Sequence, residues 1–239
     1  MRFLKLEKKN KISYISFTRT KSLNALNSQT LRELINLNKE LENDVNTRVI
    51  VYRSEGKNFS AGADIKEQQK KLSKLQIWKS NLGKEAIESI LKLNQITIAS
   101  LRGYCLGGAA CIATACDFRV ASETTQVAYP EIDLGMNLNW FGLPLLLRLI
   151  GPSKTKKMVI SGEIENANDL FKWGFIDELF IDEDLEKKTI ALAKKYASKP
   201  ALPSQMIKRS VNALTYQSDQ AIMHMDYDQF LLAREFHKE

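Results

Sequence analysis

The stretch Ile96–Asp117, ITIASLRGYCLGGAACIATACD, joins a strand pattern to a helix pattern through a turn that contains a pair of glycines. Residues Ile96–Leu101 are rich in β-branched side chains, which favours a strand. The small apolar residues of Gly107–Ala115 favour a closely packed helix. A strand that leads directly into a helix is the repeating element of α/β proteins with a largely parallel sheet. This stretch therefore predicts an α/β fold.

The same order recurs along the first half of the chain, and the pattern becomes helical from Leu143 onward. Further strands are predicted at Ile12–Phe17, Arg48–Tyr52, Phe118–Ala121 and Gln126–Ala128. Further helices are predicted at Ser28–Asp44 behind a Ser28 N-cap, Gly83–Leu93, Leu143–Ile150, Ser153–Ile160, Ala167–Trp173, Leu185–Ala197, Pro203–Leu214 and Asp219–Phe236. We expect an α/β core over residues 1–195 and a helical region over 196–239, joined as one continuous unit without a linker.

Composition excludes several classes of protein. With 239 residues and 44% hydrophobic content, the chain is long enough to bury a core. No apolar run approaches the ~20 residues that a membrane helix needs, and the charged start lacks a signal-peptide pattern, so we expect a soluble, cytoplasmic protein without membrane contact. The net charge of +7 comes from scattered lysines. Without zinc-finger spacing or an RNA-binding signature, we expect no nucleic-acid partner.

The three cysteines, Cys105, Cys111 and Cys116, do not predict a metal site. They are separated by five and four residues, and the only histidines, His224 and His237, lie far along the chain. Zinc ligands usually come in closer pairs with a second pair or histidines nearby, so we predict no metal and reduced thiols. Because Cys111 also lacks a histidine neighbour, we interpret it as a small apolar filler on a packed helix instead of a nucleophile.

Two glycine-bearing turns could carry chemistry. The first lies in NFSAGADIK, Asn58–Lys66, and the second is Leu106–Gly108. Each is predicted to follow a strand and to open a helix, where free backbone N–H groups favour negative charge. If both turns face one crevice, they supply two N–H donors to a single developing oxyanion. The alternative is that they are ordinary strand-to-helix turns, since neither matches a phosphate-binding motif.

Four ordered motifs carry a resemblance to a known family. FSAGADIK, GYCLGGAAC, the PEIDLG stretch at Pro130–Gly135 and LNALN at Leu23–Asn27 resemble the enoyl-CoA hydratase/isomerase (crotonase) family, in register from Phe3 to about Arg234. The resemblance implies a crotonase-like spiral of ββα units with a C-terminal helical trimerisation region, assembled as a homotrimer or a dimer of trimers. It also implies an acyl-CoA thioester as substrate, with coenzyme A as part of that substrate and no separate cofactor.

The resemblance also implies roles for individual residues. The backbone N–H groups of Ala63 and Gly108 would hold the thioester carbonyl. The positions that would contact the CoA or acyl group are Leu23, Ala25, Ala61, Ala63, Asp64, Ile65, Lys66, Tyr104, Gly107 and Gly108. For Tyr104, packing beside the turn is the alternative. The family commonly continues into a final basic helix that this sequence lacks, so we expect another lysine to contact the CoA phosphates or a weaker grip on them.

The sequence departs from the hydratase pattern at the acid–base pair. Family hydratases use two glutamates; the first position here is Cys111, and the second is kept as Glu131. One carboxylate suffices to move a double bond, so we expect an enoyl-CoA isomerase with Glu131 as proton shuttle. The alternatives are an enoyl-CoA hydratase, in which Asp133 or an ordered water replaces the missing glutamate, and a non-catalytic acyl-CoA-binding protein.

The surroundings of Glu131 are also predicted. An apolar acyl pocket is expected from Leu134, Met136, Leu138, Trp140 and Phe141, and its desolvation would make Glu131 a stronger base. The alternative is a solvated carboxylate in a turn.

Two other carboxylates lie near these motifs in the sequence. Asp64 is expected to cap a helix beginning at Ile65, and Asp133 is a second candidate acid in an extended segment. A further departure, NLNWFGLP at 137–144 in place of a Pro-Gly-x-Gly-Gly turn, is expected to reshape the pocket floor.

Overall fold

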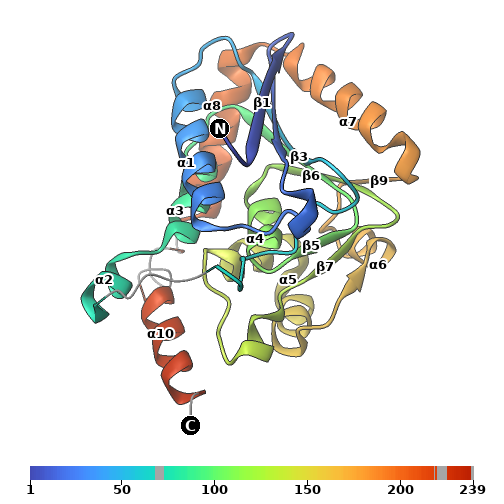
Figure 1. Cartoon of the computed structure of the whole chain (residues 1–239). Helices are drawn as coiled ribbons and strands as arrows, with labels where there is room; N and C mark the ends of the chain where they lie inside the picture. The colour runs from blue at the N-terminus through green and yellow to red at the C-terminus, as the bar shows by residue number, and fades with distance from the viewer. Residues whose placement is uncertain (68–72, 218, 220–224, 238–239) are drawn as a thin grey trace.

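The computed structural model describes residues 1–67, 73–217, 219 and 225–237. Within these residues, a six-stranded sheet runs in the order β1-β2-β3-β4-β6-β9 (Figure 1). Its strands are β1 (Leu4–Lys9), β2 (Ile12–Phe17), β3 (Val49–Ser54), β4 (Ile96–Leu101), β6 (Phe118–Ser122) and β9 (Glu178–Phe180). The β1–β2 pair is antiparallel and every later pair is parallel. The predicted largely parallel sheet is confirmed.

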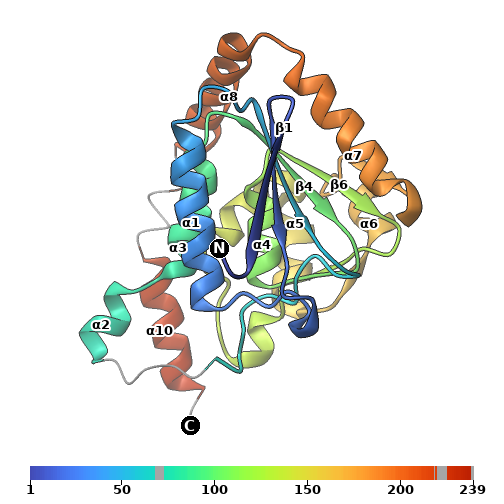
Figure 2. The same cartoon turned by 45° about the horizontal axis from the view of Figure 1, so that its top comes forward.

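Helices cover both faces of this sheet, because the buried strands are apolar on both sides. On one face, Ile15, Phe17 and Tyr52 pack in the core with α1 (Ser28–Glu42), α3 (Leu82–Leu91) and α4 (Gly108–Ala115). On the other face, alternate strand residues such as Val51 and Ile98 pack against α7 (Asp182–Ala197). Figure 2 shows α7 crossing the sheet on the side away from α1 and α3.

A second, smaller sheet lies next to α4. It consists of β5 (Tyr104–Leu106), β7 (Gln126–Ala128) and β8 (Glu165–Asn166). The remaining elements are the 3-10 helices η1 (Thr20–Ser22) and η2 (Pro130–Leu134) and the helices α2 (Lys74–Lys79), α5 (Gly142–Ser161), α6 (Ala167–Lys172), α8 (Ala201–Thr215) and α10 (Asp226–Phe236). None of the described helices combines the length and the apolar character that a bilayer crossing requires.

Near the carboxyl end of the chain, α10 packs against α2. The Trp78 Nε1–H donates to Asp228 over 2.6 Å, and the Tyr227 hydroxyl donates to the Ile77 carbonyl over 3.0 Å. The views in Figures 1 and 2 agree that these two helices lie side by side below α3. A late segment of the chain is thereby placed beside elements from its first half.

An ion pair between the buried Arg119 and the exposed Asp177 ties β6 to the segment before β9. Arg119 is 2% exposed, and its Nη2 lies 2.9 Å from Oδ2 of Asp177. The same guanidinium donates to the backbone carbonyls of Phe175 and Cys116. A charge this deeply buried is stable only when its donors are satisfied, and here they are used by the loops that precede β6 and β9.

Several predicted boundaries need correction. The N-cap of α1 is Asn27, whose side chain accepts from the Thr30 N–H over 2.8 Å, and not Ser28. The helix ends at Glu42, two residues earlier than predicted. The two helices predicted at 143–150 and 153–160, by contrast, are confirmed as the two parts of α5, which are separated by a kink with non-helical backbone at Gly151.

The C-terminal prediction is only partly open to comparison. Of the helix predicted at Asp219–Phe236, the described residues include α10 from Asp226, and 220–224, with His224, lie outside them. No pattern in the sequence predicts β1, α2, β5, β8 or β9, which are mostly short elements. The division of the chain at residue 195 stays a prediction.

Candidate functional site

A cleft of about 1030 Å³ opens between the LNALN segment, the two glycine-bearing turns, η2 and α10. Its lining residues are Arg19, Lys21, Ser22, Leu23, Ala25, Asn27, Ala61, Gly62, Ala63, Asp64, Ile65, Lys66, Glu67, Gly107, Gly108, Pro130, Glu131, Asp133, Leu134, Met136, Asn139, Trp140 and Phe230. All but one of the positions predicted to contact a CoA or acyl group are in this list. Tyr104 is the exception.

The two turns meet inside the cleft. Gly62 has φ +85°, and a Cβ built on it would lie 2.5 Å from the Leu106 carbonyl oxygen and 3.6 Å from the Gly108 nitrogen. Only glycine permits both this backbone conformation and this close approach. Across the described residues, the N–H groups of Ala63 and Gly108 have no protein acceptor. Two free donors from different turns therefore lie close together, as an oxyanion hole requires.

The first turn is not a helix N-terminus, which corrects the prediction. Residues 61–67 form turns and a single β-bridge between Ala63 and Leu26. Asp64 does not cap a helix at Ile65; its Oδ1 accepts from the Lys66 N–H over 3.2 Å, and its Oδ2 pairs with Arg19 Nη2 at 2.8 Å. The turn is therefore held by an ion pair from the segment before η1 and not by helical hydrogen bonds.

Glu131 faces the second turn. It is in the first turn of η2, directly after Pro130, whose ring fixes the entry into the 3-10 helix. A Cβ on Gly107 would lie 2.9 Å from Glu131 Oε1, so this glycine leaves room for the carboxylate. Burial raises the pKa of Glu131 to about 7, and Oε2 has no hydrogen-bond partner within the described residues. The carboxyl of Glu131 is thus desolvated, as expected, and is not the solvated turn carboxylate of the alternative, while its role as a base stays a prediction.

Asp133 occupies a different position from the one expected. Residues Pro130–Leu134 are a 3-10 helix, not an extended segment, so two residues of separation no longer point side chains the same way. Asp133 is exposed and lines the outer part of the cleft, with its carboxylate against Gly162.

The segment that departs from the family pattern forms an unusual turn. Trp140 and Phe141 both have left-handed backbone conformations, with φ 57° and 58°. For non-glycine residues this conformation costs about 1–2 kcal/mol each, so the surroundings must hold it. Leu134, Met136 and Trp140 line the cleft as predicted. Leu138 and Phe141 do not, because their side chains are buried in the core.

Cys111, at the position where the resemblance implies a first glutamate in hydratases, is packed in the core. It is 1% exposed, and its Sγ lies 3.8 Å from the Asn139 carbonyl oxygen. Burial, together with the nearby Glu131 and Asp226, raises the pKa of the thiol well above its ordinary value. The thiol is therefore neutral, which agrees with the interpretation of an apolar filler.

The described residues hold no metal-binding cluster. All three cysteines, Cys105, Cys111 and Cys116, are free and buried. Within the described part of the chain, no group of three or more His, Cys, Asp or Glu side chains is placed to hold a metal ion.

Three residues in or near the site could not be predicted from local patterns, because contacts between distant segments place them there. Arg19 meets Asp64 across 45 residues, and Phe230 reaches the cleft from α10. Asp226, also on α10, is buried near the backbone of Phe141. Tyr104 is on β5 with an exposed side chain, while its neighbour Cys105 points into the core. The alternation of a strand explains why Tyr104 misses the cleft.

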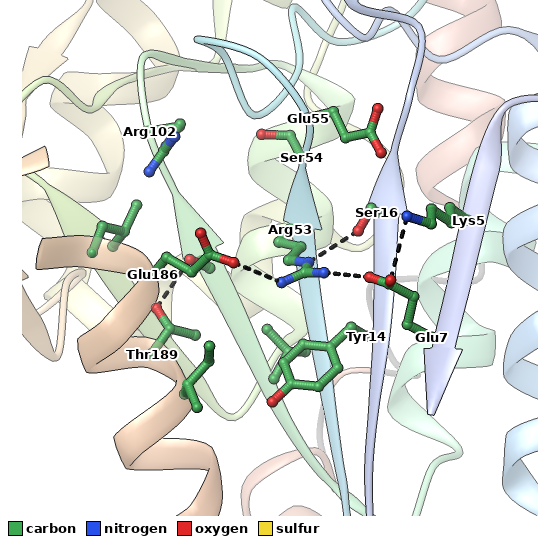
Figure 3. A pocket seen from close by; sticks show the side chains of 14 residues that line it. Lys5, Glu7, Tyr14, Ser16, Arg53, Ser54, Glu55, Arg102, Glu186 and Thr189 are labelled. Carbon is green, nitrogen blue, oxygen red and sulfur yellow. Dashed lines mark hydrogen bonds and ion pairs between the residues drawn. The ribbon is translucent and has the colours of Figure 1, made fainter. Parts of the chain in front are cut away.

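A second, smaller pocket of about 210 Å³ lies elsewhere, where α7 meets β1, β2 and β3 (Figure 3). Its centre is Arg53, which pairs with Glu7 at 2.6 Å and Glu186 at 3.2 Å and donates to Ser16 over 3.0 Å. Figure 3 shows these contacts running in a chain across the strands. Because Arg53 uses its donors on these neighbours, we interpret the cluster as a link between α7 and the sheet.

Comparison with known proteins agrees with this geometry. The sequence model of the enoyl-CoA hydratase/isomerase family matches residues 7–239. A short-chain-enoyl-CoA hydratase of Clostridium acetobutylicum is 31% identical over 209 residues, 87% of this chain and 80% of that protein. A mitochondrial enoyl-CoA hydratase of Pongo abelii is 34% identical over 206 residues, 86% of this chain and 70% of that protein.

Solved structures support the same assignment. An enoyl-CoA hydratase from Bacillus anthracis aligns with a TM-score of 0.83 at 27% identity, over 98% of this chain and 90% of that one. A probable enoyl-CoA hydratase from Mycobacterium thermoresistibile aligns with a TM-score of 0.88 at 23% identity, over 99% and 100%, which speaks for the fold alone. Sequence match, fold and the paired turns thus agree along nearly the whole length, and the chain belongs to the enoyl-CoA hydratase/isomerase family, with the crotonase fold.

Proposed function

We propose that this protein binds an acyl-CoA thioester and moves a carbon–carbon double bond, with Glu131 as the single proton shuttle. The observation that carries the proposal is the meeting of two free backbone N–H groups and one largely buried carboxylate in the same cleft. At the first of the two glutamate positions that the resemblance to family hydratases implies stands the buried Cys111, which supplies no carboxylate.

In the proposed reaction, the thioester carbonyl oxygen accepts hydrogen bonds from Ala63 and Gly108. Glu131 removes a proton from a carbon of the 3-enoyl chain, and the electron pair of that C–H bond moves into a dienolate. The negative charge on oxygen is stabilised by donors that need no reorganisation. Glu131 then returns the proton two carbons along, which yields the 2-enoyl isomer. A carboxyl with a pKa near 7 suits both steps, since it accepts and donates readily at neutral pH.

The opposite end of the cleft would hold the CoA portion. Leu23, Ala25 and Ile65 offer apolar surface there, and Lys21 and Lys66 offer positive charge to phosphates. A homotrimer remains part of the proposal. It is supported by exposed apolar side chains along α8, which a monomer has no reason to present to water: Leu202, Met206, Ile207, Val211 and Leu214.

The testing experiment uses a panel of 2-enoyl-, 3-enoyl- and 3-hydroxyacyl-CoA esters in deuterated water, with products identified by mass and NMR. Isomerisation moves the double bond and exchanges hydrogen for deuterium at the α or γ carbon. Hydration would instead add the mass of a whole water molecule to the product. Glu131→Gln is expected to lower the rate by about 10²–10⁴-fold. Asp133→Asn, on the outer part of the same cleft, is the matched control and should retain most of the activity. Isomerase activity that survives Glu131→Gln with little loss would rule out the assignment.

The second candidate is hydration of a 2-enoyl-CoA. The observation that favours it is that the relatives compared above are named enoyl-CoA hydratases. The absent second carboxylate favours isomerisation instead, because hydration needs both water activation and proton delivery to carbon. Formation of 3-hydroxyacyl-CoA from crotonyl-CoA at an ordinary enzymatic rate would decide for hydration. Tight binding of thioesters without any turnover would identify a non-catalytic acyl-CoA-binding protein.

A further inference from the structure

The left-handed turn at Trp140 and Phe141 is enclosed by three helices. From α3, Gly83 lies against the Trp140 indole so closely that an added Cβ would overlap the ring. From α4, Gly108 meets the other part of the same indole in the same way. Trp140 therefore fills the space between the first turns of α3 and α4, where any larger residue than glycine would displace it.

The third contact comes from α10. Asn137 Nδ2 donates to the Asp226 carbonyl at 3.5 Å, and the Asp226 carboxylate faces the backbone N–H of Phe141. Asp226 is 8% exposed, and its Oδ2 has no partner within the described residues. Lys84 on α3 also faces this carboxylate, with its Nζ 5.1 Å from the centre of the Phe141 ring. A buried carboxylate is costly unless a hydrogen-bond donor compensates for its lost hydration. Here the donor beside it is the Phe141 N–H of the strained turn.

The position of Trp140 matters for the ligand. Its indole lines the cleft directly beside Gly108, the proposed oxyanion donor, whereas Leu23 and Lys66 line the CoA end. An acyl chain that extends past the thioester must run along this wall. The Trp140 indole thus sets the width of the cleft beside Glu131. Contacts outside the cleft hold the backbone of Trp140 in place.

We propose that Trp140 limits the length of acyl chain that the cleft accepts, and that Asp226 on α10 is the positioning residue that holds Trp140 in place. The protein would accordingly prefer short-chain acyl-CoA thioesters. The inference rests on the proposed acyl-CoA function, but it does not depend on which reaction follows binding. The Asp226 carboxylate lies near the Phe141 N–H and does not itself line the cleft.

The test measures binding of saturated thioesters, so that it needs no turnover. Butyryl-, octanoyl- and dodecanoyl-CoA are titrated by calorimetry into wild type, Trp140→Ala, Asp226→Ala and Asp226→Asn. Each additional buried methylene is worth roughly fourfold in affinity. Trp140→Ala should therefore raise the affinity for octanoyl-CoA relative to butyryl-CoA by at least about tenfold. Asp226→Ala should move this ratio in the same direction, and Asp226→Asn, which keeps an acceptor for the Phe141 N–H, should restore the wild-type ratio.

Asp228→Ala is the matched control, because it removes a carboxylate two residues along the same helix that contacts Trp78 and not the turn. Its chain-length ratio should stay that of the wild type. An unchanged ratio in Trp140→Ala overturns the role of Trp140. A shift in Trp140→Ala without one in Asp226→Ala, or equal shifts in Asp226→Ala and Asp226→Asn, overturns the role of Asp226 as hydrogen-bond acceptor.

A further variant covers the case in which Asp226→Ala does not fold. Gly83→Ala inserts a methyl group into the space of the indole from α3, far from Asp226 in sequence. It should displace Trp140 and alter the octanoyl-to-butyryl ratio by several-fold, and an unchanged ratio contradicts the proposal. If the affinity ratios of the variants match these expectations but no enoyl ester is isomerised, the proposed reaction is wrong and the assignment of Trp140 stands. Absence of thioester binding in the wild type overturns both.

Discussion

Glu131 is expected to destabilise the fold at the pH at which it would work. Its pKa rises from an ordinary value of 4.5 to about 7 because the carboxylate is buried without a partner for Oε2. Between these two values the folded state binds the proton more tightly than the unfolded chain does. The free energy of unfolding therefore falls as pH rises through this window and levels off above pH 7.

The size of the effect follows from the shift. At 1.36 kcal/mol per pKa unit, the full penalty is about 3 kcal/mol, of which roughly 2–3 kcal/mol develops between pH 5 and pH 8. Glu131→Gln removes the charge and should therefore gain this much stability over the wild type between the two pH values. For a domain of this size, about 2–4 °C of melting temperature corresponds to each kcal/mol.

The assay is urea unfolding of both proteins at pH 5 and pH 8. Because Asp226 and every other titrating group are present in both proteins, their contributions cancel in the difference. Asp133→Asn serves as control, since its carboxylate is exposed and should show no such pH-dependent gain. A stability difference between Glu131→Gln and wild type that is the same at pH 5 and pH 8 would refute the reasoning.

Three further predictions concern other contacts. Arg19→Gln breaks the ion pair with Asp64 and should raise KM for CoA esters several-fold while changing kcat less, as steady-state kinetics would measure; a loss confined to kcat contradicts it. Arg119→Met should cost about 2–4 kcal/mol in urea unfolding, because it leaves two carbonyls without their donor and takes the guanidinium from Asp177, which keeps only the backbone N–H of residue 119, and a loss below about 1 kcal/mol would count against this network. Cys111→Ala should keep turnover within a few-fold and cost roughly 1–2 kcal/mol, since the thiol is only packed; abolished turnover in a folded variant would argue for chemistry at this thiol.

Local patterns predicted what depends on local chemistry. The strand and helix around the Gly107–Gly108 pair follow from β-branched and small residues, and the α/β class follows from their repetition. The candidate cleft was identified through the family motifs, and nearly every predicted contact position lines it. Desolvation of Glu131 was likewise predictable, because the residues that follow it are apolar.

What could not be predicted depends on contacts between distant segments. Asp64 looked like a helix cap, but its Oδ2 is used by Arg19, 45 residues earlier in the chain. The left-handed turn at Trp140 has no glycine to announce it, and it exists because α3, α4 and α10 enclose it. The same turn directs Leu138 and Phe141 into the core, so the expectation that their side chains line the acyl pocket is wrong.

The three buried thiols allow local opening of the structure to be measured by chemical labelling. Cys105, Cys111 and Cys116 lie on the strand and helix that carry the Gly107–Gly108 turn, and all are buried with raised pKa values. Alkylating reagents attack the thiolate, so the native state should resist them until α4 detaches from its neighbours. The rate at which iodoacetamide labels the native protein thus measures how often the Gly107–Gly108 turn comes apart, and an acyl-CoA thioester, the proposed ligand, should slow this labelling when it binds.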